Sequence, residues 1–244
     1  MKCIILCAGY ATRLWPLTQD NPKPLLEVAG KPIVEHILSK VEEVGEIDNV
    51  FIVTNNKFYN NFTGWLKNYK SKKKIKIIND KTSSNEGRLG AIGDVNFAIE
   101  NEKIDDDLLI IAGDNLFEFS LKEIINIFKE KKASVIALYD VKDKNLAKEY
   151  GIVDVDKNNK IIGFEEKPAE PKSTLASTGI YLYPKKTARR IAEYIKEENS
   201  PDKTGSFLAW LYNKEDVYCY ISKKRWHDIG SFEQLEEAKR GHKK

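Results

Sequence analysis

A regular alternation of short apolar runs with longer helical stretches, which extends through residues 1–140, constrains the fold more than any other feature. The apolar runs predict strands at Lys2–Cys7, Asn49–Thr54, Lys74–Ile78, Asp107–Ala112 and Ala133–Tyr139. The segments between them predict helices at Val34–Val44, Phe58–Tyr69, Ala91–Glu102 and Leu121–Lys131. Strands that alternate with helices of this length form βαβ units with a parallel, helix-covered sheet. The runs are apolar almost throughout, as strands buried on both faces must be.

The pattern changes after Tyr139. The stretch "YGIVDVDKNNKIIGFEEKP" predicts two strands joined by the polar turn Asp156–Lys160, which is a hairpin added to the parallel core. Next come a strand in "LASTGIYLYP", a helix to about Asn199, a strand in "DVYCYIS" and a closing helix in "SFEQLEEAKRGHKK" that Ser231 caps. We find no internal repeat and no long linker. The sequence therefore predicts one α/β domain over residues 1–244, with a Rossmann-like, mixed, mostly parallel sheet flanked by helices.

Composition narrows the class of protein. The chain has 40 Lys and Arg residues and 37 Asp and Glu residues, which gives a net charge of +3. It therefore lacks the large basic excess that is typical of nucleic-acid-binding proteins. The N-terminal apolar run is too short for a secretory signal, and no stretch is long enough to span a membrane. Cys3 and Cys7 fall in a predicted buried strand, and three cysteines cannot all pair. We therefore expect buried thiols and a cytoplasmic protein with no membrane or nucleic-acid partner.

The stretch "LCAGYATRLWPLTQDNPKPLLEVAGKPI", residues 6–33, combines a small-residue turn with several cations. A strand that ends in Ala8 and Gly9 lets the backbone approach a ligand closely, and ligands of doubly wound sheets bind beyond such strand ends. Backbone N–H groups and Arg13 could bind phosphates there. The letters match neither the Rossmann fingerprint nor the P-loop. Taken alone, Gly9 and Arg13 favour an ordinary tight strand–helix connection over a phosphate site.

Two acidic residues that lie near glycines are also candidates. In "LLIIAGDNLF" a predicted strand ends in Gly113, which presents Asp114 at the same sheet edge as the opening loop. A carboxylate beside a phosphate site can hold Mg²⁺, which takes only one or two protein carboxylates. Asp228 in "RWHDIGSF" could be a second ligand. Either carboxylate could instead cap the turn that follows it.

In this order, the motifs resemble those of the sugar-phosphate nucleotidyltransferases, or nucleotide-sugar pyrophosphorylases. These include glucose-1-phosphate thymidylyl- and uridylyltransferases and mannose-1-phosphate guanylyltransferases. The family's opening signature, roughly LAxGxGTRLxPxT with PKxL and GKP after it, matches "LCAGYATRLWPLT", "PKPLL" and "GKPI". "AGDN", "YGIV", "EEKP", "STGIYLY" and "WHDIG" then follow in order, so the resemblance extends from Met1 to about Ala238. It implies the nucleotide-diphospho-sugar transferase fold, with the hairpin in the sugar-binding region.

The resemblance implies a role for each matching residue. Arg13 and Lys23 would be the catalytic cations, and Asp114 and Asp228 would hold Mg²⁺. The NTP-binding set would be Leu6, Ala8, Gly9, Tyr10, Ala11, Thr12, Asn85 and Gly90, the last two in the base-reading stretch "NEGRLGAIGD". The sugar-phosphate set would be Asn115, Gly151, Glu166, Lys167, Thr178 and Gly179. Residues 1–140 would mainly bind the NTP, and residues 141–244 would mainly bind the sugar phosphate.

The implied reaction joins an NTP and a sugar-1-phosphate to give an NDP-sugar and pyrophosphate. The sugar phosphate attacks the α-phosphorus in line, and it needs no general base because it is already an anion. The chain departs from the signature at Ala11, which replaces a glycine and would be strained if that position needs a positive φ. The base, the sugar and the oligomeric state stay open, although family members often form homo-oligomers.

Three alternatives remain. The first is a cytidylyltransferase that acts on phosphocholine or another non-sugar phosphate. The second is a non-catalytic subunit that senses sugar nucleotides, although Lys23, Asp114 and Asp228 are all present. The third is a plain nucleotide- or dinucleotide-binding module, for which the chain lacks a matching fingerprint.

Overall fold

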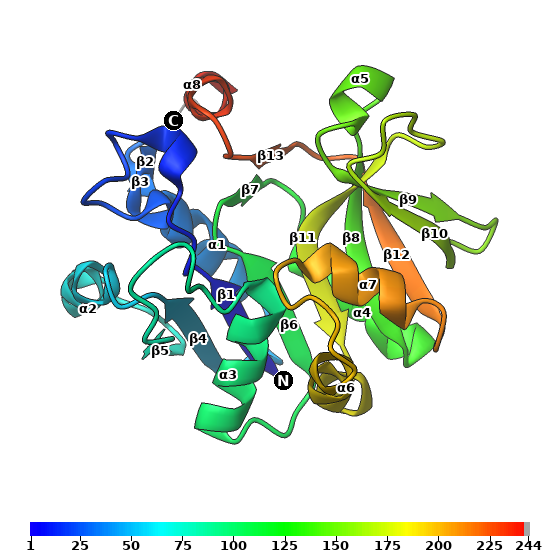
Figure 1. Ribbon diagram of the computed structural model, residues 1–244, viewed down its shortest axis with the longest axis horizontal. Helices are drawn as coiled ribbons and strands as arrows, with labels where there is room; N and C mark the ends of the chain where they lie inside the picture. The colour runs from blue at the N-terminus through cyan, green and yellow to red at the C-terminus, as the bar shows by residue number, and fades with distance from the viewer. Residues whose placement is uncertain (242–244) are drawn as a thin grey trace.

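In the computed structural model, which describes residues 1–241, a nine-stranded sheet runs through the molecule (Figure 1). One part of it is parallel, with the strand order β6-β1-β4-β5. These strands are β1 (Lys2–Leu6), β4 (Asn49–Thr54), β5 (Lys74–Asn79) and β6 (Leu108–Ala112). Each lies within one residue of its predicted bounds. The carboxyl ends of β1 and β6 are adjacent, because Leu6 pairs with Ala112.

The long strand β11 (Leu175–Tyr183) joins this parallel part to the rest of the sheet. It pairs antiparallel with β6 on one side and with β8 (Ser134–Asp140) on the other. Its register shifts between Ser177 and Tyr181, where Gly179 has a φ of 73°. The predicted hairpin, β9 (Gly151–Val155) and β10 (Ile161–Glu166), attaches to its N-terminal end, and β12 (Val217–Ser222) pairs with β8. The predicted fold class, a mixed α/β sheet with an added hairpin, is confirmed.

Helices cover both faces of the sheet and close two apolar cores. One core takes residues from α1 (Ile33–Glu42), α2 (Tyr59–Asn68), α4 (Leu121–Lys131), α5 (Lys144–Ala147) and α8 (Phe232–Gly241). The other takes residues from α3 (Ala91–Glu102), α6 (Lys185–Lys196) and α7 (Thr204–Leu211), and Figure 1 shows α3 and α7 in front of the sheet. Cys3 and Ile5 of β1 face the first core and Ile4 faces the second, because side chains alternate along a strand.

Several short elements are absent from the sequence prediction. They are α5, α7, the hairpin of β2 (Glu27–Val28) and β3 (Lys31–Pro32), the 3₁₀ turns Thr12–Leu14 and Lys23–Leu25, and the ladder of β7 (Asn115–Phe117) with β13 (Trp226–Asp228). The closing helix begins as predicted, since Ser231 Oγ accepts the Gln234 N–H at 3.3 Å. Its predicted end at residues 242–244 lies outside the described residues.

The three cysteines are buried free thiols, as predicted. Burial raises the pKa of the Cys7 thiol well above its usual range. The structure contains, within residues 1–241, no helix of the length and apolarity needed to cross a membrane.

Two carboxyl groups lie buried where β5 meets the start of α3. Asp80 follows β5 and accepts hydrogen bonds from the Thr82 backbone N–H at 2.7 Å and from the Thr82 hydroxyl at 2.9 Å. Asp94 lies in the first turn of α3 and is 6% exposed. Burial and, after it, the charge of Asp80 raise the pKa of Asp94 to about 8. Asp94 therefore keeps its proton in the folded protein at neutral pH.

We predict that Asp94→Asn removes a pH-dependent loss of stability. Between about pH 4 and pH 8 the folded state holds a proton that the unfolded state has released, so the free energy of unfolding of the wild type falls as pH rises. Asparagine carries no charge, so the free energy of unfolding of the variant should exceed that of the wild type by ~1–3 kcal/mol at pH 8 and by almost nothing at pH 4. Urea unfolding at the two pH values measures the difference. Asp20→Asn, at an exposed carboxylate, is the control, and an equal gain there would contradict this explanation.

Candidate active site

A pocket of about 280 Å³ lies over the loop that follows β1. We call it the loop pocket; its lining comprises Leu6, Cys7, Gly9, Tyr10, Ala11, Thr12, Arg13, Lys23, Pro24, Asn85, Arg88 and Asp114. It thus brings together both predicted catalytic cations and six of the eight residues predicted to bind the NTP. The other two, Ala8 and Gly90, are buried and are not part of this lining.

Ala11 adopts the left-handed backbone conformation, with φ 49° and ψ 40°. The strain anticipated for a non-glycine residue at this position is therefore present, at a cost on the order of 1 kcal/mol. Two hydrogen bonds hold the turn, because the Ala11 carbonyl accepts the Thr18 hydroxyl at 2.7 Å and the Leu14 N–H at 3.0 Å. The loop keeps a fixed shape without the glycine of the family signature.

Lys23 and Asp114 meet in the loop pocket although they are far apart in the chain. Lys23 begins a short 3₁₀ turn, with Pro22 before it and the buried Pro24 after it, and its Nζ lies 2.7 Å from Asp114 Oδ2. Asp114 reaches this place because Gly113 packs directly on the end of β1. A Cβ atom at Gly113 would lie 2.5 Å from Cys7 Sγ and 2.6 Å from the Leu6 carbonyl oxygen.

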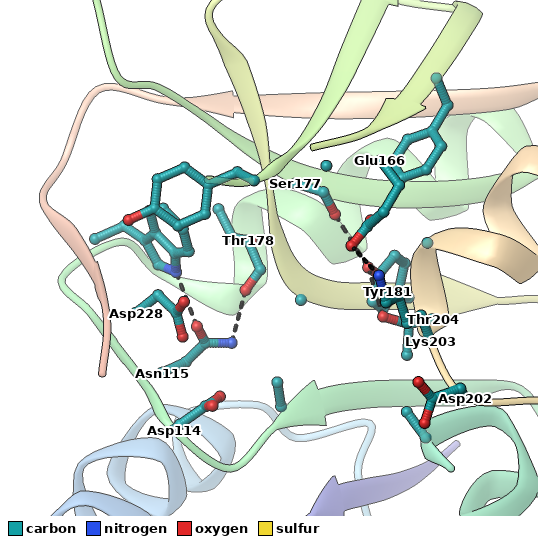
Figure 2. A pocket seen from close by; sticks show the side chains of 18 of the residues that line it. Asp114, Asn115, Glu166, Ser177, Thr178, Tyr181, Asp202, Lys203, Thr204 and Asp228 are labelled. Atoms are coloured by element: carbon teal, nitrogen blue, oxygen red, sulfur yellow. Dashed lines mark hydrogen bonds and ion pairs between the residues drawn. The ribbon is translucent and has the colours of Figure 1, made fainter. Parts of the chain in front are cut away.

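Asp228 comes to the same place along β13. The pairing of β13 with β7 sets Asp228 opposite Asn115, and the Ile229 N–H donates to the Asp114 carbonyl at 3.1 Å. Burial and, after it, the charge of Asp114 raise the pKa of Asp228 to about 7, while Lys23 is the main cation that opposes this shift. Figure 2 shows the Asp114 and Asp228 carboxylates on either side of Asn115.

The two carboxylates fit a divalent cation. Their mutual repulsion, visible in the raised pKa of Asp228, is what a bound cation would relieve. No cluster of three or more His, Cys, Asp and Glu suited to a metal exists among the described residues 1–241. Mg²⁺ tolerates so small a protein set, because it keeps several waters and often takes one or two carboxylates together with substrate phosphates.

A second pocket, of about 450 Å³, lies between the β9–β10 hairpin, β11 and α7, and we call it the hairpin pocket. Five of the six predicted sugar-phosphate residues line it: Asn115, Gly151, Glu166, Thr178 and Gly179. The sixth, Lys167, is exposed and is not part of this lining, although its charge lowers the pKa of Asp228. Arg13 and Asp114 line both pockets, so the two meet at these residues.

Asn115 is 1% exposed and uses its amide to hold a wall of the hairpin pocket. Its Nδ2 donates to the Thr178 carbonyl at 2.6 Å, and its Oδ1 accepts the Trp226 Nε1–H at 2.9 Å (Figure 2). The amide therefore ties β7 to the register shift of β11 and to Trp226 of β13. Asn115 thus has a structural role that is independent of any contact with a sugar.

At three predicted glycines, a side chain would crowd neighbouring atoms. A Cβ at Gly151 would lie 2.7 Å from Phe164 Cζ, and one at Gly179 would lie 3.0 Å from Ala112 Cβ. Gly90 has a φ of 82°, and a Cβ there would lie 2.5 Å from Asp202 Cα. Gly90 thus packs on a distant backbone segment and does not line the loop pocket.

Sequence reasoning missed much of the hairpin pocket. The missed residues include Tyr150, Phe164, Ser177, Tyr181, Asp202, Lys203, Thr204, Gly205 and Trp226. Tyr150, Ser177 and Trp226 stand inside or next to motifs already singled out, which was a usable signal. The residues at positions 202–205 lie at the start of the unpredicted α7 and had no such signal.

Comparisons with known proteins identify the family. The chain belongs to the nucleotidyl transferase family, whose model matches residues 2–244. The resemblance to sugar-phosphate nucleotidyltransferases seen in the opening motif is thereby confirmed.

One curated relative is the "Bifunctional protein GlmU" of Methanocaldococcus jannaschii, which is 33% identical over 230 residues, or 94% of this chain. The chain spans about half of that relative, 51% of its length. A structure from Bacillus anthracis, provisionally named a glucose-1-phosphate thymidylyltransferase, superposes with a TM-score of 0.84 at 25% identity, over 98% of this chain and 94% of that one. A UDP-glucose pyrophosphorylase in complex with UDP-glucose shares the fold, with a TM-score of 0.81 at 21% identity over 98% and 97% of the two chains.

We predict that Asn115→Ala destabilises the protein by about 2–4 kcal/mol, because the buried Trp226 N–H and the Thr178 carbonyl both lose their partner and a cavity forms. Urea unfolding followed by circular dichroism measures the loss. Asn213→Ala removes an exposed amide that donates to the Ala209 carbonyl, and it should cost less than ~0.5 kcal/mol. A cost at Asn115 no larger than this control would show that the amide does not hold the wall.

Proposed function

We propose that the protein is a sugar-1-phosphate nucleotidyltransferase, which makes an NDP-sugar and pyrophosphate from an NTP and a sugar-1-phosphate. One observation carries the proposal: two pockets of different character meet at Arg13 and Asp114, beside Lys23 and Asp228. The lining of the loop pocket includes three cations, Arg13, Lys23 and Arg88, which suits a triphosphate. The hairpin pocket is lined by aromatic rings and hydrogen-bonding side chains, which suits a sugar.

In this proposal the NTP lies in the loop pocket with its α-phosphate at the junction, where the sugar phosphate of the hairpin pocket attacks it. The attacking oxygen is already anionic, so the protein has no proton to remove and acts by positioning and by neutralising charge. Arg13 and Lys23 would neutralise the triphosphate and the departing pyrophosphate. Lys167, at the end of β10, would bind the phosphate of the incoming sugar.

Asp114 and Asp228 would hold Mg²⁺ in this proposal. Bound there, the ion would supply positive charge to the phosphate oxygens that bear the developing negative charge. The Lys23 ammonium at 2.7 Å from Asp114 Oδ2 keeps that carboxylate oriented toward the junction.

The same geometry supports a division of labour along the chain. Every residue that lines the loop pocket lies within residues 1–140, in accord with an NTP-binding half. The hairpin pocket takes Gly151, Glu166 and most of its other lining residues from positions 141–244. Arg13 and Asp114 are the first-half residues at the junction. The halves share one sheet through β11, so they would act as one domain.

The substrates would be found with a grid of reactions. The purified protein with Mg²⁺ is mixed with each of ATP, GTP, CTP, UTP and dTTP, and with glucose-, mannose-, galactose- or N-acetylglucosamine-1-phosphate or phosphocholine. Released pyrophosphate is measured. A strong signal with one sugar phosphate would support the proposal and name both substrates. A signal with phosphocholine alone would replace the proposal with a cytidylyltransferase-type activity, and a blank grid would contradict it.

We predict that Asp114→Asn and Asp228→Asn each lower kcat at least ~100-fold with the preferred pair, because the junction loses the charge that would hold the cation. Both variants should keep the circular dichroism spectrum of the wild type. Asp154→Asn, on a carboxylate of β9 that lines neither pocket, should keep full activity. Near-normal turnover in both junction variants would rule out the two-carboxylate site.

A further inference from the structure

A backbone segment that carries no assigned role, Pro201–Lys203, lies between the two pockets. Its carbonyls cap α3: the Pro201 oxygen accepts the Ile92 N–H and the Asp202 oxygen accepts the Ala91 N–H, both at 2.9 Å. The start of α3 has no side-chain cap of its own, so this distant segment satisfies its free N–H groups. These bonds, together with the close packing on Gly90, fix the segment against the loop that leads into α3.

The side chain of Asp202 reaches the loop pocket through Arg88. Asp202 Oδ1 accepts the Arg88 Nε–H at 2.9 Å, and Arg88 Nη1 donates to the Asn85 carbonyl at 2.9 Å. Arg88 and Asn85 line the loop pocket, whereas Asp202 lines only the hairpin pocket. The side chains of Arg88 and Asp202 are 42% and 39% exposed, so their ion pair adds little stability. Its effect is to set where the guanidinium and the Asn85 backbone lie.

The next residue, Lys203, acts on the hairpin pocket. Its Nζ lies 3.1 Å from Glu166 Oε1, and Figure 2 shows this ion pair beside the linked hydroxyls of Tyr181 and Thr204. The other carboxylate oxygen of Glu166 lies close to Gly205, where a Cβ would come within 2.9 Å of it. Glu166 thus lies against the beginning of α7 and is paired there with Lys203.

We propose that Pro201–Lys203 is a positioning element for both pockets: Asp202 positions Arg88 and Asn85 toward the nucleotide, and Lys203 positions Glu166 toward the sugar phosphate. The inference rests on the proposed function and deepens it. Two adjacent side chains of one segment then act on different substrates. The Asp202 half of the proposal gives the more specific test, because Asp202 lines the pocket of the sugar phosphate and yet would act on the nucleotide.

The test compares Asp202→Ala with Lys203→Met in the full chain, with the substrate pair found by the grid. Asp202→Ala keeps the backbone carbonyl that caps α3, and it should raise KM for the NTP about three- to tenfold with KM for the sugar phosphate changed less than twofold. Lys203→Met should raise KM for the sugar phosphate about three- to tenfold, with KM for the NTP changed less than twofold. The matched controls are Asp105→Ala and Lys172→Met, which break exposed ion pairs with Arg189 and Glu165 outside both pockets, and which should change neither constant.

A double-mutant cycle separates positioning from a general loss of structure. If Asp202 acts through Arg88, Arg88→Met with Asp202→Ala should raise KM for the NTP no further than Arg88→Met alone. Additive effects would overturn this half of the inference. So would an Asp202→Ala variant that raises KM for the sugar phosphate alone, as a direct contact would. A Lys203→Met variant with an unchanged KM for the sugar phosphate would overturn the other half.

Calorimetric titration with the five nucleotides of the grid distinguishes this inference from the proposed function. If the wild type binds a nucleotide but forms no product, the proposed function fails and the Lys203 half fails with it. The Asp202 half of the inference then stands if Asp202→Ala weakens the binding of that nucleotide three- to tenfold, and fails if the binding is unchanged. A wild type that binds none of the five nucleotides overturns the whole inference.

Discussion

The close contact between the ends of β1 and β6 is the constraint on which the candidate site depends. The two strands pair up to Leu6 and Ala112, and Gly113 then donates its N–H to the Leu6 carbonyl at 2.9 Å. A side chain at position 113 would run into Cys7 and into that carbonyl. The chain must therefore turn at once, and the turn leaves Asp114 beside the loop that follows β1. A larger residue at position 113 would separate the two strand ends and move Asp114 away from Lys23.

The remaining charges gather around Asp114 by routes that do not involve the parallel sheet. Lys23 arrives on a 3₁₀ turn between prolines, and Asp228 arrives on β13, which pairs with the three residues after Asp114. Burial and, after it, the charge of Asp114 disfavour the ionised form of Asp228, as its raised pKa shows, and Lys23 offsets only part of that cost. The site is thus an arrangement of charge that an added cation and an anionic substrate would complete. In the proposed function, the two phosphate groups would meet at this arrangement of charge.

The sequence predicts the elements with long apolar runs and misses those that depend on a few contacts. β1 and β6 end within one residue of their predicted bounds, because buried parallel strands are apolar from end to end. β13 has three residues and shows no alternation, so the sequence marks Asp228 as a candidate two residues before Gly230 but does not place it opposite Asn115. α7 escapes prediction because it has only eight residues and begins inside "SPDKTG", a stretch that is typical of a loop. The part of the hairpin pocket around Lys203 could therefore not be predicted from the sequence, since the start of α7 brings Lys203 to Glu166.

The unpredicted part of the site differs from the predicted part in how it is held. Around Gly113 the position of each group follows from backbone packing that tolerates no alternative. At Pro201–Lys203 the backbone is equally fixed, by its bonds to α3, but the side chains are half-exposed ion pairs that add little stability. Changes in these side chains should alter what the pockets accept without threatening the fold. If the segment positions the two substrates as proposed, it is a place where substrate preference could change, because the geometry of its side chains depends on these ion pairs and the stability of the fold does not.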